Sequence, residues 1–204
     1  ISFAINLISL EFLLPKQNQV PKHHPAMDYK DLPNFMTELR KHKLNSSLAL
    51  QLLILTACRT SEIIKAQWNE VNFNDKVWII PKERTKTSII HRVPLSEGAI
   101  SILHEMKKRQ SSNYIFEGSI KGKNLSDNAI LTFLKRNFPN INAVPHGFRS
   151  SFRDWAETRN TYSHRAMEYC LGHAIKNKTE AAYQRDDLLE QRSLIMNSWN
   201  RYCF

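Results

Sequence analysis

The sequence has few cysteines, and they are not arranged as metal sites or disulfide frameworks require. Only 3 of its 204 residues are cysteine, and no Cys-x-x-Cys pair is present. An odd number of widely spaced cysteines, two of them inside apolar helical patterns, favours buried thiols in a reducing cytoplasm and argues against a zinc site. The three are Cys58, Cys170 and Cys203.

A long apolar run is also missing. Residues 1–14 are apolar, but they include Asn6 and Glu11 and are too short to span a membrane. They lack the basic start and the small-residue cleavage site of a signal peptide. The sequence has no internal repeat and no low-complexity tract. It begins at Ile1 rather than at methionine, which suggests a fragment of a longer protein.

What the sequence does have is positive charge. Lysine and arginine number 29 against 19 acidic residues, which gives a net charge of +10. This excess favours a polyanionic partner, with nucleic acid first and an anionic membrane surface second, and the alternative is a protein that is merely basic. Hydrophobic residues make up 42% of the chain, so one domain with a sizeable core is expected.

Helical spacing of apolar residues dominates the chain after a polar start. Residues 1–27 are predicted to be an N-terminal segment and linker, because residues 15–27 are polar and hold three prolines. Residues 28–204 are predicted to form one domain. Its expected helices cover 32–39, 47–57, 60–67 (with Thr60 as the cap), 96–109, 126–137, 147–159, 162–171 and 179–199.

Three short β-rich runs interrupt the helical pattern. They lie at residues 71–73, 77–81 and 91–95, and polar connections separate them. Such runs predict a small three-stranded antiparallel sheet. The expected fold class is therefore α+β, mainly α-helical, with one small sheet.

The stretch PHGFRSSFRDW places His146 and Arg149 three residues apart at the start of a predicted helix. Residues at this spacing project from one face. A helix N-terminus already carries the positive end of the helix dipole, so two more basic groups there repel locally unless an anion binds. The alternative is a solvated pair on the surface.

Arg59 directly follows the most apolar predicted helix, in the stretch LTACRTSEII. A charged group at that position must reach solvent or meet a partner, and Glu62 lies one turn further on. The pair is either a structural ion pair at a helix start or part of an anion site.

The connection between the second and third predicted strands carries Lys82, Arg84 and Lys86. A hairpin tip with three cations suits a phosphate backbone, although most such runs are solvated turns. His91, at the start of the next strand, is predicted to be either a surface residue or a second anion contact.

The stretch YCLGHAIKNKTEAAYQRDD carries a histidine and a tyrosine that are separated by ten residues. Gly172 suits a helix C-terminus, which puts His173 in a turn rather than on an apolar face. Tyr183 lies early in the next predicted helix. Taken alone, a tyrosine in such a place is usually a packing residue.

Together these segments resemble the catalytic domain of tyrosine recombinases, and most of all the integrases of phages and genomic islands. The resemblance rests on the order Arg, Lys, His-x-x-Arg, Leu-Gly-His, Tyr and covers roughly residues 24–200. It implies a supporting role for Glu62 and DNA contacts for Lys82, Arg84 and His91. The catalytic residues that it implies are Arg59, Lys86, His146, Arg149, His173 and the nucleophile Tyr183.

The sequence departs from the family pattern in two places. Ala57 stands where many members have glycine, and we expect no loss from this change. Family members also usually carry a helical core-binding domain before the catalytic domain, whereas only residues 1–27 precede it in this sequence.

The resemblance implies site-specific DNA recombination through a 3′-phosphotyrosyl intermediate, without a metal or other cofactor. The implied partners are double-stranded DNA and other recombinase protomers on DNA, with no membrane partner. The implied source is a mobile element such as a prophage, and the implied location is the bacterial cytoplasm, in association with the nucleoid. We expect the isolated chain to be mainly monomeric, with the apolar face of its last helix folded back onto its own domain.

Three other functions stay open on the sequence. One is nicking and rejoining of the type IB topoisomerase kind. Another is a truncated integrase that only binds DNA weakly. The third is a metal-dependent nuclease built on His23, His24, His91 and His164.

Overall fold

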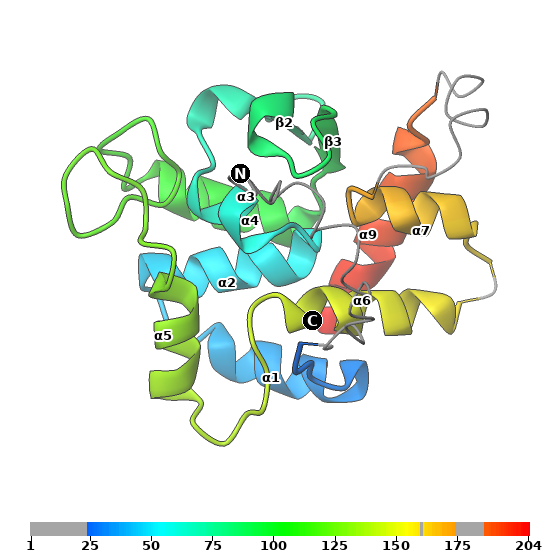
Figure 1. Cartoon of the computed structure of the whole chain (residues 1–204), viewed down its shortest axis with the longest axis horizontal. Coiled ribbons are helices and arrows are strands. Elements are labelled where there is room, and N and C mark those ends of the chain that lie inside the picture. Colours follow the sequence, from blue (N-terminus) through cyan, green and yellow to red (C-terminus); the bar gives the residue numbers. More distant parts are fainter. Residues whose placement is uncertain (1–23, 160, 174–185) are drawn as a thin grey trace, which may run out of the picture.

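The structure is a computed structural model that describes residues 24–159, 161–173 and 186–204 (Figure 1). The predicted nucleophile Tyr183 and the first part of the last predicted helix lie outside the described residues. The predicted fold class is confirmed, because the described residues form mainly helices together with one small three-stranded antiparallel sheet. None of the helices in these ranges has the length and hydropathy that a membrane crossing needs.

A buried helix, α2 (Asn45–Thr56), forms the centre of the molecule (Figure 1). It is apolar all round, and every residue from Ser47 to Thr56 is buried. A helix of this composition needs neighbours on all sides. Those that pack on it are α1 (Leu32–Leu39), α3 (Thr60–Ile64), α4 (Glu97–Lys107), α5 (Ala129–Asn137), α6 (Gly147–Glu157) and α9 (Leu189–Cys203).

The sheet follows α3 in the chain, and its strands pair in the order β1-β2-β3. Its strands are β1 (Val71–Asn72), β2 (Val77–Ile80) and β3 (His91–Pro94), all antiparallel. The β2–β3 connection contains the short 3-10 helix Lys82–Arg84. This hairpin confirms the predicted one, and its connection projects toward the start of α3, where Arg84 donates a hydrogen bond to the carbonyl of Glu62.

Helix α7 (His164–Cys170) and α9 close the C-terminal side of the domain. The apolar face of α9 packs on its own chain, as predicted, through Ile195, Met196 and Trp199. The Trp199 indole also donates a hydrogen bond of 2.8 Å to the carbonyl oxygen of Ile54 on α2. All three cysteines are free and buried, which confirms their prediction as core residues.

Most of the predicted helices after residue 59 extend beyond the observed ones, and two of these differences have a clear local cause. Helix α3 ends at Ile64 rather than near residue 67, and Arg59 instead of Thr60 is its cap. At the other end, residues 186–188 are not helical, and α9 begins at Leu189. Leu188 has a φ of 55°, in the left-handed region, and a right-handed helix does not continue through such a residue.

The end of the predicted linker belongs to the folded domain. The backbone N–H of Val144 donates to the carbonyl of Pro25 at 3.1 Å, and the hydroxyl of Ser151 donates to the carbonyl of Met27. A Cβ on Gly147 would lie only 2.1 Å from the Pro25 oxygen, so only glycine lets this segment pack on the start of α6. Residues 24–27 are therefore part of the domain that positions α6.

Candidate active site

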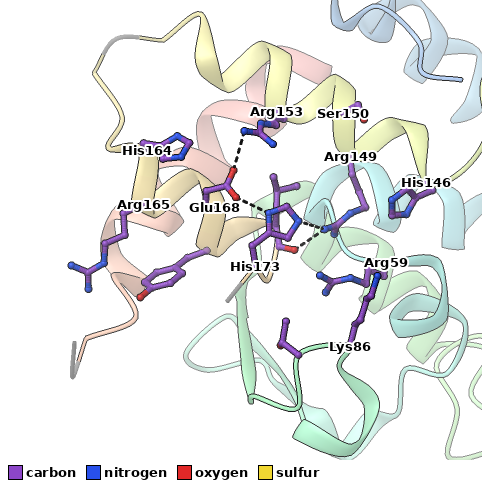
Figure 2. A pocket seen from close by; sticks show the side chains of 13 residues that line it. Arg59, Lys86, His146, Arg149, Ser150, Arg153, His164, Arg165, Glu168 and His173 are labelled. Carbon is purple, nitrogen blue, oxygen red and sulfur yellow. Dashed lines mark hydrogen bonds and ion pairs between the residues drawn. The ribbon is translucent and has the colours of Figure 1, made fainter. Parts of the chain in front are cut away.

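A cleft of about 900 Å³ opens between the α6–α7 side of the domain and the β2–β3 connection (Figure 2). Basic side chains dominate its lining, and Glu168 is the single acidic residue among the lining residues that the structure describes. Five of the six predicted catalytic residues line this cleft, and the sixth, Tyr183, is outside the described ranges. The basic lining residues are Arg59, Lys86, His146, Arg149, Arg153, His164, Arg165 and His173.

Arg59 is fixed by three hydrogen bonds. Its Nη1 donates to Oε1 of Glu62 at 3.0 Å, its backbone N–H donates to Oε2 of Glu62 at 2.8 Å, and its Nη2 donates to the carbonyl of Gly172 at 3.1 Å. Glu62 is fully buried, whereas 14% of the Arg59 side chain is exposed. The predicted Arg59–Glu62 contact is therefore present, and it orients the guanidinium at the cleft.

Arg149 is more deeply buried than Arg59 and has no carboxylate within ion-pair distance among the described residues. Its Nη1 donates to the carbonyl of Ala57, and its Nη2 donates to the carbonyl of Leu171 at 2.7 Å. Burial, followed by the charge of Arg59, lowers the pKa of Arg149 to about 10, so the group remains a cation at neutral pH. A buried cation whose partners are backbone carbonyls and the neutral acceptor nitrogen of a histidine, rather than a carboxylate, is well placed to bind an anion.

His146 lies at the N-terminus of α6 and faces the cleft beside Arg149 (Figure 2). Its ring makes an edge-to-face contact with His24, with 4.8 Å between centroids. Partial burial, followed by the charges of Arg149 and His24, lowers the pKa of His146 to about 4. The ring is therefore neutral at pH 7 and keeps a nitrogen lone pair.

His173 is held between an acid and a cation. Its Nδ1 lies 2.7 Å from Oε2 of Glu168, and its Nε2 lies 3.3 Å from Nη2 of Arg149. Figure 2 shows this chain of contacts, which continues from Glu168 to Arg153. Glu168 was not among the site residues predicted from the sequence. Its signal in the sequence is a glutamate five residues before the histidine of the Leu-Gly-His stretch.

Of the three cations on the β2–β3 connection, only one lines the cleft. Lys86 is exposed and lines the cleft, whereas Lys82 is exposed on the same connection and is not among the lining residues. Arg84 pairs with Glu70 at 2.8 Å, and only 15% of its side chain is exposed. Arg84 therefore forms a structural ion pair that anchors the connection, and its DNA contact stays a prediction.

His91 is buried rather than on the surface, with 7% of the residue exposed. Its Nε2 lies 3.2 Å from the carbonyl oxygen of Tyr169, which makes Nε2 the donor. Burial, followed by the charge of Arg192, lowers the pKa of His91 to about 3, so the ring is neutral. The alternative that His91 contacts an anion at the surface is therefore wrong, because the ring packs beneath Arg59 and Gly172.

One buried group of potential metal ligands lies next to the cleft. The ligand atoms of Cys58, Glu62 and His91 lie within 4.8 Å of one another. Both oxygens of Glu62 already accept hydrogen bonds from Arg59, and burial, followed by the charge of Glu62, raises the pKa of the Cys58 thiol to about 12. A protonated thiol and a neighbouring guanidinium do not suit a metal cation.

The chain is similar to known proteins of one family. The sequence model of the phage integrase family matches residues 25–189. Prophage integrase IntA of Escherichia coli strain K12 is 33% identical over 182 residues, which cover 87% of this chain and 44% of that protein. The integrase of Enterobacteria phage P4 is 28% identical over 200 residues, which cover 89% of this chain and 46% of that protein. The chain thus spans less than half the length of these relatives.

Solved structures of low sequence identity share the fold. The integrase from mycobacterium phage Brujita superposes with a TM-score of 0.64 at 15% identity, and the match covers 93% of this chain and 64% of that one. A lambda integrase tetramer bound to a Holliday junction gives a TM-score of 0.58 at 14% identity, over 77% of this chain and 49% of that one.

Proposed function

This chain belongs to the phage integrase family, and we propose on that basis that it cleaves and rejoins DNA strands, with Tyr183 as the nucleophile. The observation that carries the proposal is the single cleft lined by Arg59, Lys86, His146, Arg149 and His173. These residues come from four separate parts of the chain: the α2–α3 turn, the β2–β3 connection, the start of α6 and the turn after α7.

The cleft suits a phosphodiester. In the proposed reaction the transition state gathers negative charge on the non-bridging oxygens of the phosphate. Arg59 and Arg149 each present a planar set of donors to such oxygens. Both are held by hydrogen bonds before any substrate enters, so little reorganisation is needed. Losing one such preorganised donor typically costs about 10²–10³ in rate.

The proposed step forms one bond and breaks another. The hydroxyl oxygen of Tyr183 attacks phosphorus, a 3′-phosphotyrosyl link forms, and the bond to the 5′-oxygen breaks. A free tyrosine has a pKa of about 10 and needs help to lose its proton. His146 and His173 hydrogen bond to the phosphate oxygens or accept that proton, and Lys86 gives a proton to the leaving 5′-oxygen. The covalent link keeps the energy of the phosphodiester, so rejoining needs no ATP.

No metal is assigned to this step because of the chemistry of the lining. Mg²⁺ prefers carboxylate and other oxygen ligands. The acidic side chain in the described lining is Glu168, and its oxygens already face His173 and Arg153. Fixed cations supply the positive charge that a metal would otherwise bring.

Double-stranded DNA and further protomers are the proposed partners. The related lambda integrase has been solved as a tetramer on a Holliday junction. In this chain the apolar face of α9 already packs in cis, so we expect a monomer at micromolar concentration without DNA. Light scattering across a dilution series tests this, and a stable dimer at micromolar concentration contradicts it.

The experiment that tests the function uses a nicked suicide substrate that traps the covalent intermediate. The unmodified chain should form a protein–DNA adduct that survives denaturation. Tyr183→Phe should abolish the adduct and leave DNA binding within about a factor of a few, because one hydroxyl contributes little to the contact area. An adduct with Tyr183→Phe contradicts the proposed nucleophile. If the unmodified chain binds DNA but forms no adduct, the result supports the alternative of a truncated integrase that only binds DNA.

A further inference from the structure

We infer that Glu168 is a positioning residue, whose carboxylate fixes the proton and the orientation of His173 at the cleft. The consequence for DNA cleavage rests on the function proposed above. The structural part of the inference does not, because it concerns only the contact between these two side chains.

The contacts hold Glu168 from both sides. Its Oε2 lies 2.7 Å from Nδ1 of His173, and its Oε1 lies 3.6 Å from Nη2 of Arg153. Partial burial raises the pKa of Glu168, but the hydrogen bond from His173 and the charges of His173, Arg153 and His164 together hold this pKa below its ordinary value. Glu168 is therefore a carboxylate at neutral pH, and a carboxylate can only accept.

The backbone at the end of α7 creates this contact. The N–H of His173 donates to the carbonyl of Glu168 at 3.1 Å, and the N–H of Gly172 donates to the carbonyl of Tyr169 at 3.0 Å. With Gly172 at a φ of +60°, these two bonds form a Schellman motif. In this motif the side chains of the two residues joined by the bond that spans five positions, the first and the last of the motif, lie in contact, and this contact is usually apolar. Here those residues are Glu168 and His173, and the contact is a hydrogen bond.

The contact determines which ring nitrogen of His173 carries the proton. Because Glu168 only accepts, Nδ1 is the donor, and in the neutral ring Nε2 keeps the lone pair. The 3.3 Å contact from Nη2 of Arg149 to Nε2 agrees with this tautomer, since the guanidinium only donates. A phosphate that draws the Arg149 donor away leaves Nε2 facing the cleft. If Nε2 then takes up a proton, the Glu168 carboxylate stabilises the imidazolium.

The test compares two variants of Glu168 with a matched control. Glu168→Ala removes the acceptor, whereas Glu168→Gln keeps an acceptor oxygen in the same place. Glu157→Ala is the control, because Glu157 also pairs with Arg153, at 2.8 Å, but lies on α6 and does not line the cleft. In each protein, long-range proton–nitrogen NMR of labelled histidine reports the tautomer of His173 at a pH where the ring is neutral. The suicide substrate reports the rate of adduct formation.

We expect the parent and Glu157→Ala to show the Nδ1–H tautomer and equal adduct rates. Glu168→Ala should show both tautomers and a rate lower by about 10–100-fold, the size of effect seen when a metal-binding histidine loses its orienting partner. Glu168→Gln should keep the Nδ1–H tautomer and recover most of the rate. The inference is overturned if His173 keeps that tautomer in Glu168→Ala, or if Glu168→Ala reacts as fast as the control. If no protein forms an adduct, the proposed function fails, and the tautomers alone decide the role of Glu168.

Discussion

At the scale of single residues, two lysines of the β2–β3 connection compete for the role of general acid. Lys86 lines the cleft and Lys82 does not, which favours Lys86. A general acid matters only when the leaving group needs a proton. Lys86→Ala should therefore slow cleavage of ordinary DNA, and slow it far less when sulfur replaces the leaving 5′-oxygen. Rates on both substrates measure this, with Lys82→Ala as the matched control. Equal defects on the two substrates would remove Lys86 from the role.

The buried ring of His91 should make the stability of the folded protein depend on pH. Its pKa is about 3 in the folded protein, mainly because of burial, against an ordinary value of 6.5. Between these values the unfolded chain binds one proton more than the folded chain. The contribution of His91 is thus fully present above pH 6.5 and is lost as the pH falls, at about 1.4 kcal/mol per pH unit.

His91→Gln should remove this dependence. The free energy of unfolding, measured by denaturant titration from pH 7 to pH 4, should fall less steeply in the variant by about 1.4 kcal/mol per unit. Parallel curves for the two proteins would show that His91 is not buried as a neutral ring.

The sequence predicted correctly which catalytic candidates gather in the cleft, but it did not predict which of the other site candidates are buried. Arg59, Lys86, His146, Arg149 and His173 all line it. His91 and Arg84 were expected at the surface because a strand start and a polar connection usually lie there. The burial of His91 and the pairing of Arg84 with Glu70 depend on elements that are distant in sequence, which local pattern does not report.

At the scale of elements, the turn between α2 and α3 connects the core to the cleft. Ala57 in this turn has a φ of 50°, in the left-handed region that costs an L-residue roughly 1–2 kcal/mol. The expectation that alanine is harmless there is therefore wrong. The turn keeps this conformation because the carbonyl of Ala57 accepts a hydrogen bond from Arg149.

Ala57→Gly should stabilise the protein by about 1 kcal/mol, because glycine adopts a positive φ without strain. Ala49→Gly is the matched control, since Ala49 is buried in the middle of α2 and glycine there should destabilise by about 1 kcal/mol. Denaturation midpoints of the two variants should move in opposite directions. Destabilisation by Ala57→Gly would contradict the left-handed turn.

The sequence predicted the existence of elements well and their ends less well. The three strands and the buried helix α2 are where periodicity and composition indicated them. Helix α3 is shorter than predicted because Lys65 has already left helical geometry, with a φ of −99° and a ψ of 9°. Helix α9 starts after Leu188 because this residue has a positive φ, which the spacing of apolar residues does not predict.

At the scale of the whole molecule, a net charge of +10 and a basic cleft predict binding dominated by phosphates. Each neutralised phosphate releases counterions, so affinity falls with salt. For a footprint of about six phosphates, the affinity of the chain for duplex DNA should drop about 10³-fold between about 50 and 200 mM salt, with little sequence preference. Fluorescence anisotropy over a salt series measures this. Tight, sequence-specific binding that survives about 200 mM salt would contradict it.

The central claim is that Tyr183 becomes joined to DNA, and mapping of the adduct tests it most directly. Trypsin cleaves after Lys178 and Arg185, and the peptide between them, residues 179–185, contains Tyr183 as its one tyrosine. Mass spectrometry of the digested suicide-substrate adduct should find the phosphonucleotide on this peptide, at Tyr183. A nucleotide attached to any other residue, or an adduct whose peptide 179–185 remains unmodified, would contradict the account.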